Sequence, residues 1–176
     1  MATDTRDDDM VIYHPNREKA TSQATKMIVF VLLLASAGLI SLITFGGWSN
    51  LQGDQIVSIA YIAIYCLMAY FVLRWSRGVL PLASALAIVL LVFAAIAVPG
   101  WFARSHSGYH NPGLPPDLVG LLTVITIPVQ LLLIAFAMRG FQQEWNVEIE
   151  MTRDEMERRR RRDRGNGSGY RPQPQG

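Results

Sequence analysis

The sequence predicts an all-α integral membrane protein: a bundle of four transmembrane helices, arranged up and down, with both termini in the cytoplasm. Two observations carry this prediction. Four long apolar segments contain no Asp, Glu, Lys or Arg, and all but one of the 16 Lys and Arg residues fall on one side of the membrane that these segments imply. About 20 helical residues, rising about 1.5 Å each, cross the ~30 Å hydrocarbon layer. The segments lack the alternation of barrel strands, so we expect helices.

The transmembrane domain is predicted at residues 27–138, with its helices at 27–48, 56–73, 79–102 and 118–138. One alternative concerns the first helix. Its Ala35-Ser36-Ala37 resembles a signal-peptidase site, and cleavage there would leave three helices. Apolar residues continue past this site to Phe45, whereas a cleavage site normally lies just beyond the hydrophobic run. We therefore favour four helices.

The distribution of basic residues predicts the topology, because Lys and Arg in short loops stay in the cytoplasm. The N-terminal segment, the connection at 74–78 and the C-terminal segment all carry basic residues. The connection at 49–55 carries none, and the connection at 103–117 carries only Arg104. We therefore expect these two connections to face outward and both termini to face inward.

Tryptophan gives a second indication of where the membrane boundaries lie. Trp48 and Trp101 are at predicted outer helix ends, and Trp75 and Trp145 are at or just beyond inner ends. Indole prefers the headgroup layer, so this placement favours an interfacial belt over a soluble core. The predicted location is a cell membrane. Arg is far more frequent than Lys in this Ala- and Gly-rich chain, which suggests a GC-rich bacterial genome.

Three segments outside the membrane are expected: a cytoplasmic N-terminal segment, an Arg-rich and partly helical cytoplasmic segment, and a disordered tail, at residues 1–26, 139–164 and 165–176. The first dozen residues have no apolar period and are expected to lack structure. Two patterns compete after the fourth helix. The spacing of Phe141, Trp145 and Ile149 suits a helix, whereas the alternation of Val147, Ile149 and Met151 suits a strand.

Three polar residues are candidates for a ligand-binding site inside the membrane. Ser36, Tyr65 and Gln130 lie at similar depths from the outer helix ends, so they are expected to meet near the midplane. Gln130 follows Pro128, whose missing N–H frees the carbonyl of Val124 and whose ring favours a kink. A small-solute site would use such an arrangement. Ordinary helix packing would use it as well, since interhelical hydrogen bonds in membranes contribute about 0.6 kcal/mol each.

Other intramembrane patterns predict contacts between helices. Small residues let backbones approach, and aromatic side chains fill the space opposite. The residues concerned are Ala37 with Ser41, Ala83 with Ala87, and Tyr61 with Tyr65. A ligand-binding aromatic stripe is the alternative for the two tyrosines. The single cysteine, Cys66, is predicted inside the second helix, where it is expected to serve packing, and it offers no intramolecular disulfide.

The predicted outer loop holds the candidate metal ligands, His106, His110 and Asp117. Two histidines and a carboxylate are ligands that zinc accepts. The glycines and prolines among them favour turns over the helix that a His spacing of four would suit. A solvated hairpin loop is therefore the competing interpretation.

The C-terminal arginines are candidates for contact with the membrane surface. They are Arg153, Arg158, Arg159, Arg160, Arg161, Arg162 and Arg164. Each basic residue near an anionic leaflet contributes about 1 kcal/mol. Docking of RNA or of an acidic protein is the alternative. The run has no interleaved aromatic residues to stack bases, which weakens the RNA interpretation.

The predicted function follows largely from what the sequence lacks. It has no Gly-rich phosphate loop, no cysteine pair, and no Ser or Cys nucleophile with an identifiable base. Its predicted helices lack the charges that mark ion pathways. We expect a non-enzymatic accessory or scaffold subunit without a cofactor, associated with lipid and with a membrane protein partner or itself, and without a specific nucleic acid. The alternative is an oligomeric small-solute transporter or channel. A membrane enzyme would need His106 and His110 on a metal or a lipid headgroup.

Overall fold

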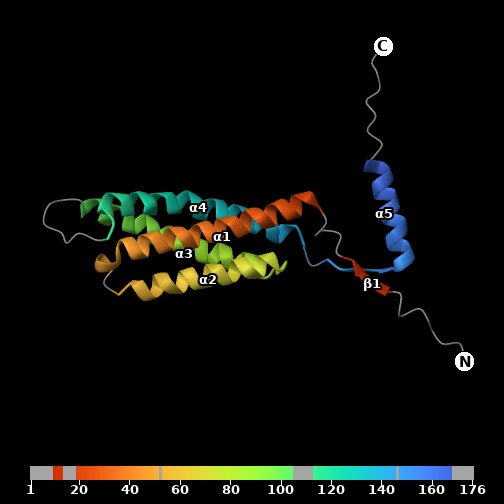
Figure 1. The fold of residues 1–176 in the computed structure, drawn as a ribbon, viewed down its shortest axis with the longest axis horizontal. Helices are drawn as coiled ribbons and strands as arrows, with labels where there is room; N and C mark the ends of the chain where they lie inside the picture. Colours follow the sequence, from red (N-terminus) through yellow and green to blue (C-terminus); the bar gives the residue numbers. More distant parts are fainter. Residues whose placement is uncertain (1–9, 14–18, 52, 105–112, 146, 168–176) are drawn as a thin grey trace, which may run out of the picture. The chain divides into compact units, whose positions relative to one another are not determined.

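The computed structural model describes residues 10–13, 19–51, 53–104, 113–145 and 147–167 (Figure 1). The chain divides into two compact units. One contains residues 16–146, and the other combines residues 1–15 with residues 147–176. The first unit is entirely helical in its described part, which confirms the all-α class there.

Four helices of this unit are long and apolar enough to cross a membrane, as the sequence predicts. They are α1 (Ala20–Gly46), α2 (Gln55–Leu73), α3 (Val79–Ala103) and α4 (Pro116–Gln142), with a short 3-10 turn, η1 (Trp48–Asn50), after α1. The observed helices α1 and α4 extend beyond the predicted spans, because polar residues before Met27 and after Met138 continue the helices. The length and composition of these four helices are compatible with a multi-pass membrane protein.

The helix ends follow from local sequence. Pro116 lies in the first turn of α4, where its missing N–H costs nothing, and Asp117 places a carboxylate near the positive end of the helix dipole. Helix α2 ends at Leu73, and the chain turns at Trp75 with a positive φ of 62°. Helix α1 ends at a Gly46-Gly47 pair. A Cβ at Gly47 would collide with the ring of Trp101, so glycine permits α1 and α3 to approach here.

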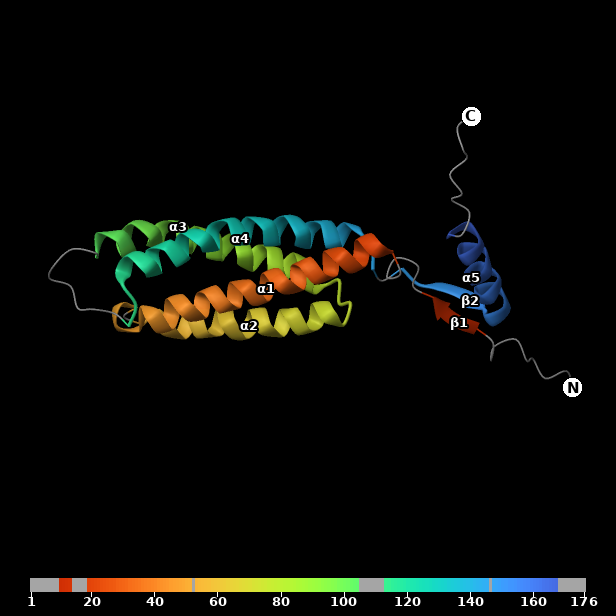
Figure 2. The ribbon, with the colours of Figure 1, turned by 45° about the horizontal axis from the view of Figure 1, so that its top comes forward.

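The helices pack unevenly (Figure 2). Helix α3 packs along α4, and α1 packs along both α2 and α4, whereas α2 and α3 contact each other little. The core is built from fully buried side chains of all four helices, including Leu33, Tyr65, Leu80 and Leu133. Ala83 and Ala87 are also fully buried, in accord with the predicted close approach of backbones. The remaining apolar side chains face outward, where a membrane would surround them.

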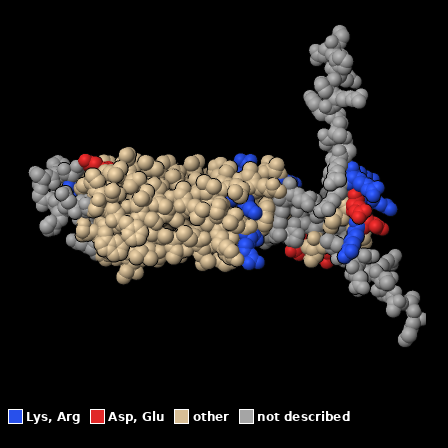
Figure 3. Space-filling model, viewed as in Figure 1, with Lys and Arg blue, Asp and Glu red and all other residues tan. Residues whose placement is uncertain are grey.

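Lys and Arg side chains gather at one end of the helical unit, while the flank between the ends carries uncharged residues (Figure 3). The Trp residues lie at helix ends as predicted, but two of them are not on the lipid-facing surface. Trp101 is 4% exposed and Trp145 is fully buried, because both pack against neighbouring helices. The expectation for Cys66 is wrong: its side chain is exposed on α2 rather than packed between helices.

The second unit contains two strands and a helix. Strand β1 (Met10–Tyr13) pairs antiparallel with β2 (Ile149–Thr152), with Met10 opposite Thr152 and Tyr13 opposite Ile149, and helix α5 (Arg153–Gly167) follows β2. This ribbon was not included in the predicted fold class. The expectation that the first dozen residues lack structure is wrong from Met10 onward. After α4, the strand alternation prevails over the helical spacing, and helix α5 enters the predicted tail at residues 165–167.

Candidate functional site

The three predicted polar residues form one buried cluster that joins three helices. The Tyr65 hydroxyl donates a hydrogen bond to Gln130 Oε1 at 3.0 Å, and Gln130 Nε2 donates to Ser36 Oγ at 2.9 Å. Ser36 Oγ in turn donates to the Leu32 carbonyl of its own helix at 2.7 Å. All three side chains have 0% exposure. The structure thus brings Ser36, Tyr65 and Gln130 together, while their role as a ligand site stays a prediction.

Each side chain reaches the cluster because its helix turns a buried face inward at that depth. Ser36 comes from α1, Tyr65 from α2 and Gln130 from α4. Helix α4 continues through Pro128 without interruption between Pro116 and Gln142. Tyr61, one turn before Tyr65, makes an edge-to-face contact with it, with ring centroids 5.8 Å apart. The tyrosine pair therefore packs within the bundle, as the sequence predicts for a contact surface.

The cluster has little capacity for chemistry. Ser36 Oγ, Tyr65 Oη and both amide heteroatoms of Gln130 already have partners. A fully hydrogen-bonded buried network fixes the relative positions of its helices. The cluster holds no carboxylate, imidazole or amine that would move a proton near neutral pH. Its geometry supports helix–helix adhesion.

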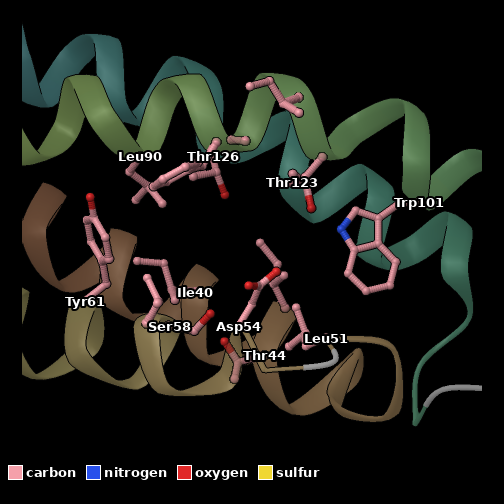
Figure 4. A pocket seen from close by; sticks show the side chains of 16 residues that line it. Ile40, Thr44, Leu51, Asp54, Ser58, Tyr61, Leu90, Trp101, Thr123 and Thr126 are labelled. Carbon is pink, nitrogen blue, oxygen red and sulfur yellow. The ribbon is translucent and has the colours of Figure 1, made fainter.

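A cavity that the sequence analysis missed lies on one side of this cluster. It has a volume of about 440 Å³ and is lined by residues of all four helices and of the α1–α2 connection (Figure 4). Tyr61 and Thr126 line it toward the cluster, and Trp101 and Asp54 line it toward the helix ends. We call this end of the unit, where η1, Asp54 and Trp101 lie, the cavity end. Cavities depend on side-chain packing between helices, for which the sequence has no simple signal.

The opposite end, which we call the basic end, contains the start of α1, the connection between α2 and α3, and the last turn of α4. Its basic residues are Lys26, Arg74, Arg77 and Arg139, and aromatic side chains close it. Trp75 and Trp145 make an edge-to-face contact with ring centroids 5.3 Å apart. The Lys26 ammonium lies 4.1 Å from the centroid of the Trp75 ring, and its Nζ donates to the Leu73 carbonyl at 3.2 Å. Ammonium over an indole face is a favourable cation–π arrangement.

Further hydrogen bonds at the basic end join the α2–α3 connection to α4, and the segment after α4 to α1. Arg77 Nε donates to the Phe141 carbonyl at 2.8 Å, and its guanidinium lies 4.4 Å from the Phe141 ring centroid. Gln143 joins Trp145 to α1, since it accepts from the Trp145 indole and donates to Thr25 Oγ1, both at 3.0 Å. On the exposed surface, Arg74 donates a hydrogen bond to the Tyr70 hydroxyl at 3.0 Å, and this bond raises the pKa of the guanidinium.

The predicted metal ligands are not brought together within the described part of the chain. His106 and His110 lie outside the described residues, and Asp117 is exposed in the first turn of α4. Among the described residues, no group of three His, Cys, Asp or Glu side chains is placed to hold a metal ion. The zinc site stays a prediction without structural support.

The predicted lipid-contacting arginines lie on α5. Arg153 begins this helix, and Arg153, Arg158, Arg161 and Arg162 are exposed. The side chains of Arg159, Arg160 and Arg164 lie outside the described residues. Acidic side chains accompany the arginines in the first turn, where Asp154 and Glu155 suit the helix dipole.

Comparison of this chain with protein-family models, with curated proteins and with solved structures finds no match.

Proposed function

We propose that this protein is a non-enzymatic accessory or scaffold subunit of a larger assembly in a cell membrane. The observation that carries the proposal is the closed midplane: Ser36, Tyr65 and Gln130 have 0% exposure and satisfy one another's hydrogen-bonding groups. A solute path through the bundle would need water or substrate at this depth. A buried centre whose side chains are hydrogen-bonded to one another instead holds three helices in a fixed arrangement, which suits a structural subunit.

The proposal includes an up-and-down bundle with both termini in the cytoplasm. The concentration of Lys and Arg at the basic end supports it through the positive-inside rule. The pairing of β1 with β2 supports it independently. These strands precede the first helix and follow the fourth, so they pair only if both lie on the same side of the membrane. Loss of β1 by signal-peptide cleavage would remove one strand of this pair.

The surfaces of the protein suit partners in and beside the membrane. Apolar side chains such as Ile56, Leu67 and Ile96 are more than half exposed on the flanks of the helices and would face lipid, a protein partner or a second copy of the chain. The exposed arginines of α5 would contact anionic lipid at about 1 kcal/mol per residue.

The decisive experiment is gentle extraction of the tagged protein from native membranes, followed by affinity isolation and mass spectrometry. We expect a stoichiometric partner that resists washing. A parallel isolation of an unrelated tagged four-helix membrane protein separates specific partners from detergent-resistant background. Recovery of this chain alone, as a monomer or a homo-oligomer, would contradict the scaffold role.

An oligomeric small-solute transporter or channel is the second candidate, and the cavity next to the polar cluster favours it. In such a protein, Tyr65 and Gln130 would receive a solute that enters from the cavity. Gln130→Leu would then abolish complementation of a deletion strain while leaving the protein folded and its partners attached. The scaffold role predicts the reverse: complementation persists whenever the partner remains bound.

The topology has its own test in a Cys66→Ala background, which removes the exposed native thiol. A cysteine introduced at Ser107 is expected to react with an impermeant thiol reagent added outside intact cells, and one introduced at Ser168 only after lysis. The opposite labelling pattern would overturn the cytoplasmic location of the termini.

A further inference from the structure

The cavity at the cavity end is a mostly apolar chamber that is partly open at the surface of the helical unit. Its walls include Ile40, Leu90, Phe93, Ala94 and Trp101. The volume of about 440 Å³ falls within the range of small-molecule sites, roughly 300 to 1,000 Å³. The chamber lies beside α2 and α3, which pack together least of the neighbouring helices. A membrane around the unit would therefore present acyl chains to this seam.

A buried hydroxyl in the wall has no partner. Thr44 has 0% exposure, and its Oγ1 makes no hydrogen bond within the described residues. Other hydroxyls in the helices, including those of Thr25, Thr123 and Thr126, donate to the carbonyl one turn earlier. Thr44 departs from this pattern at the wall of the cavity, near the end of α1. A buried donor without an acceptor is costly, so an acceptor supplied by an occupant would stabilise the site.

The charges at the cavity suggest what kind of occupant it takes. Asp54 is the one charged residue in the cavity wall, and it forms no ion pair among the described residues. Figure 4 shows Asp54 at the α1–α2 connection, across the cavity from Thr123 and Trp101. Behind the wall, the Arg104 guanidinium stacks on Trp101, 5.0 Å from its ring. A carboxylate in the cavity and a guanidinium beside its wall complement a headgroup that carries both an ammonium and a phosphate.

We propose that this cavity binds one phospholipid with a primary ammonium headgroup, of the phosphatidylethanolamine class. One acyl chain enters between α2 and α3 and fills the apolar chamber. The ester carbonyl accepts a hydrogen bond from Thr44, the ammonium pairs with Asp54, and the phosphate lies toward Arg104. This site is independent of the scaffold role, since a lipid can occupy it whether or not a protein partner binds the outer surface.

The test is native mass spectrometry of the full chain released from nanodiscs that contain equal amounts of phosphatidylethanolamine and phosphatidylglycerol. We expect one retained phosphatidylethanolamine per chain and little phosphatidylglycerol. Equal retention of the two lipids would overturn the assignment of the headgroup. Release of the chain without lipid would overturn the site itself.

Two variants with matched controls locate the lipid. Ala94→Leu places additional side-chain volume in the chamber and is expected to reduce lipid retention strongly, whereas Ala95→Leu makes the same change at the exposed neighbouring position of α3 and is expected to leave retention unchanged. Asp54→Asn removes the carboxylate from an exposed position and leaves the core intact. It is expected to reduce the preference for phosphatidylethanolamine roughly twofold to fivefold, the range of a partly exposed ion pair, whereas Asp117→Asn leaves it unchanged.

The two variant pairs distinguish a lipid bound in the cavity from a lipid bound on the outer surface, and they test the contact between Asp54 and the headgroup. Retention that survives Ala94→Leu, or that falls equally in Ala95→Leu, would show lipid on the outer surface and contradict the cavity site. An unchanged lipid preference in Asp54→Asn would remove the ammonium contact. A homodimer without lipid would mean that a second copy covers the cavity. None of these outcomes depends on recovery of a protein partner, so failure here and failure of the scaffold role are distinguishable.

Discussion

The two ends of the helical unit differ in how tightly their helices pack. Toward the basic end, the buried residues of α2 and α3 include Met68, Val72 and Leu80, and the Trp75–Trp145 pair closes the bundle. Toward the cavity end, the corresponding helices present Ser58 and Ala94 to the space between them. Small side chains leave volume that large ones fill. Helices of similar apolar character therefore form a packed end and an end with a cavity, and small side chains such as Ser58 and Ala94 contribute to the space at the second end.

The largest loss of stability is expected when the Trp75–Trp145 contact, which closes the basic end, is removed. Trp145→Ala deletes a fully buried indole and its contacts with Trp75 and Gln143, so we expect a loss of about 3–5 kcal/mol in the free energy of unfolding. Trp48→Ala, at 46% exposure, is the control at the cavity end and should cost far less. The measurement is equilibrium unfolding in mixed detergent. Equal losses for the two variants would remove the distinction between the ends.

A matched pair on α3 tests the difference in packing directly. Ala87 and Ala94 lie two turns apart on the same helix face, one in the packed core and one in the cavity wall. Ala87→Leu should destabilise the protein by about 1–3 kcal/mol, because extra volume in a filled core forces strain. Ala94→Leu should change stability by less than about 0.5 kcal/mol in the same detergent. Comparable destabilisation by both variants would mean that the cavity is not open to a larger side chain.

The polar cluster lies between the two ends and is expected to contribute less to the free energy of unfolding. Tyr65→Phe removes the hydroxyl that donates to Gln130 Oε1. We expect the free energy of unfolding to fall by about 0.6 kcal/mol, and by at most about 1.7 kcal/mol. Tyr61→Phe is the matched control, because no described residue accepts from the Tyr61 hydroxyl, and it should be neutral. A double-mutant cycle of Tyr65→Phe with Ser36→Ala measures the coupling through Gln130. A coupling energy of zero would contradict a linked network.

The smallest effect is expected at the surface of the basic end. Lys26→Met removes the ammonium that contacts the Trp75 ring and the Leu73 carbonyl. We expect the free energy of unfolding to fall by about 0.5–1 kcal/mol. Lys19→Met, at an exposed position before α1, is the control and should leave the unfolding midpoint unchanged. Because the contact is partly electrostatic, added salt should narrow the difference between wild type and Lys26→Met. A difference that grows with salt would contradict the cation–π account.

Sequence reasoning reached the helices and the polar cluster because both depend on simple quantities. The length of an uninterrupted apolar segment predicts a membrane span. The similar depths of Ser36, Tyr65 and Gln130 from the outer helix ends were sufficient to predict that their side chains meet. The inward rotation of Trp101 and Trp145 was missed, since position along a helix does not determine which face a side chain occupies. The cavity was missed because it depends on facing positions from four helices at once.

The errors outside the membrane have a different origin. Residues Met10–Tyr13 form a strand by pairing with Ile149–Thr152. The local sequence of four residues does not predict a partner so far along the chain. The competing signals after α4 were real: the alternation at Ile149 and Met151 became β2, and a helix resumed at Arg153. Neither pattern alone indicated that both would be used in succession.

The pairing of β1 with β2 also imposes an order on biosynthesis. Strand β1 leaves the ribosome before any of the four helices, whereas β2 is made only after all of them. Until then, β1 has no partner, and its edge stays available to other chains or to chaperones. The ribbon therefore closes as a final step, when every helix has been synthesised. A chain truncated after α4 would contain all four helices but lack this closure, and its N-terminal strand would have no partner.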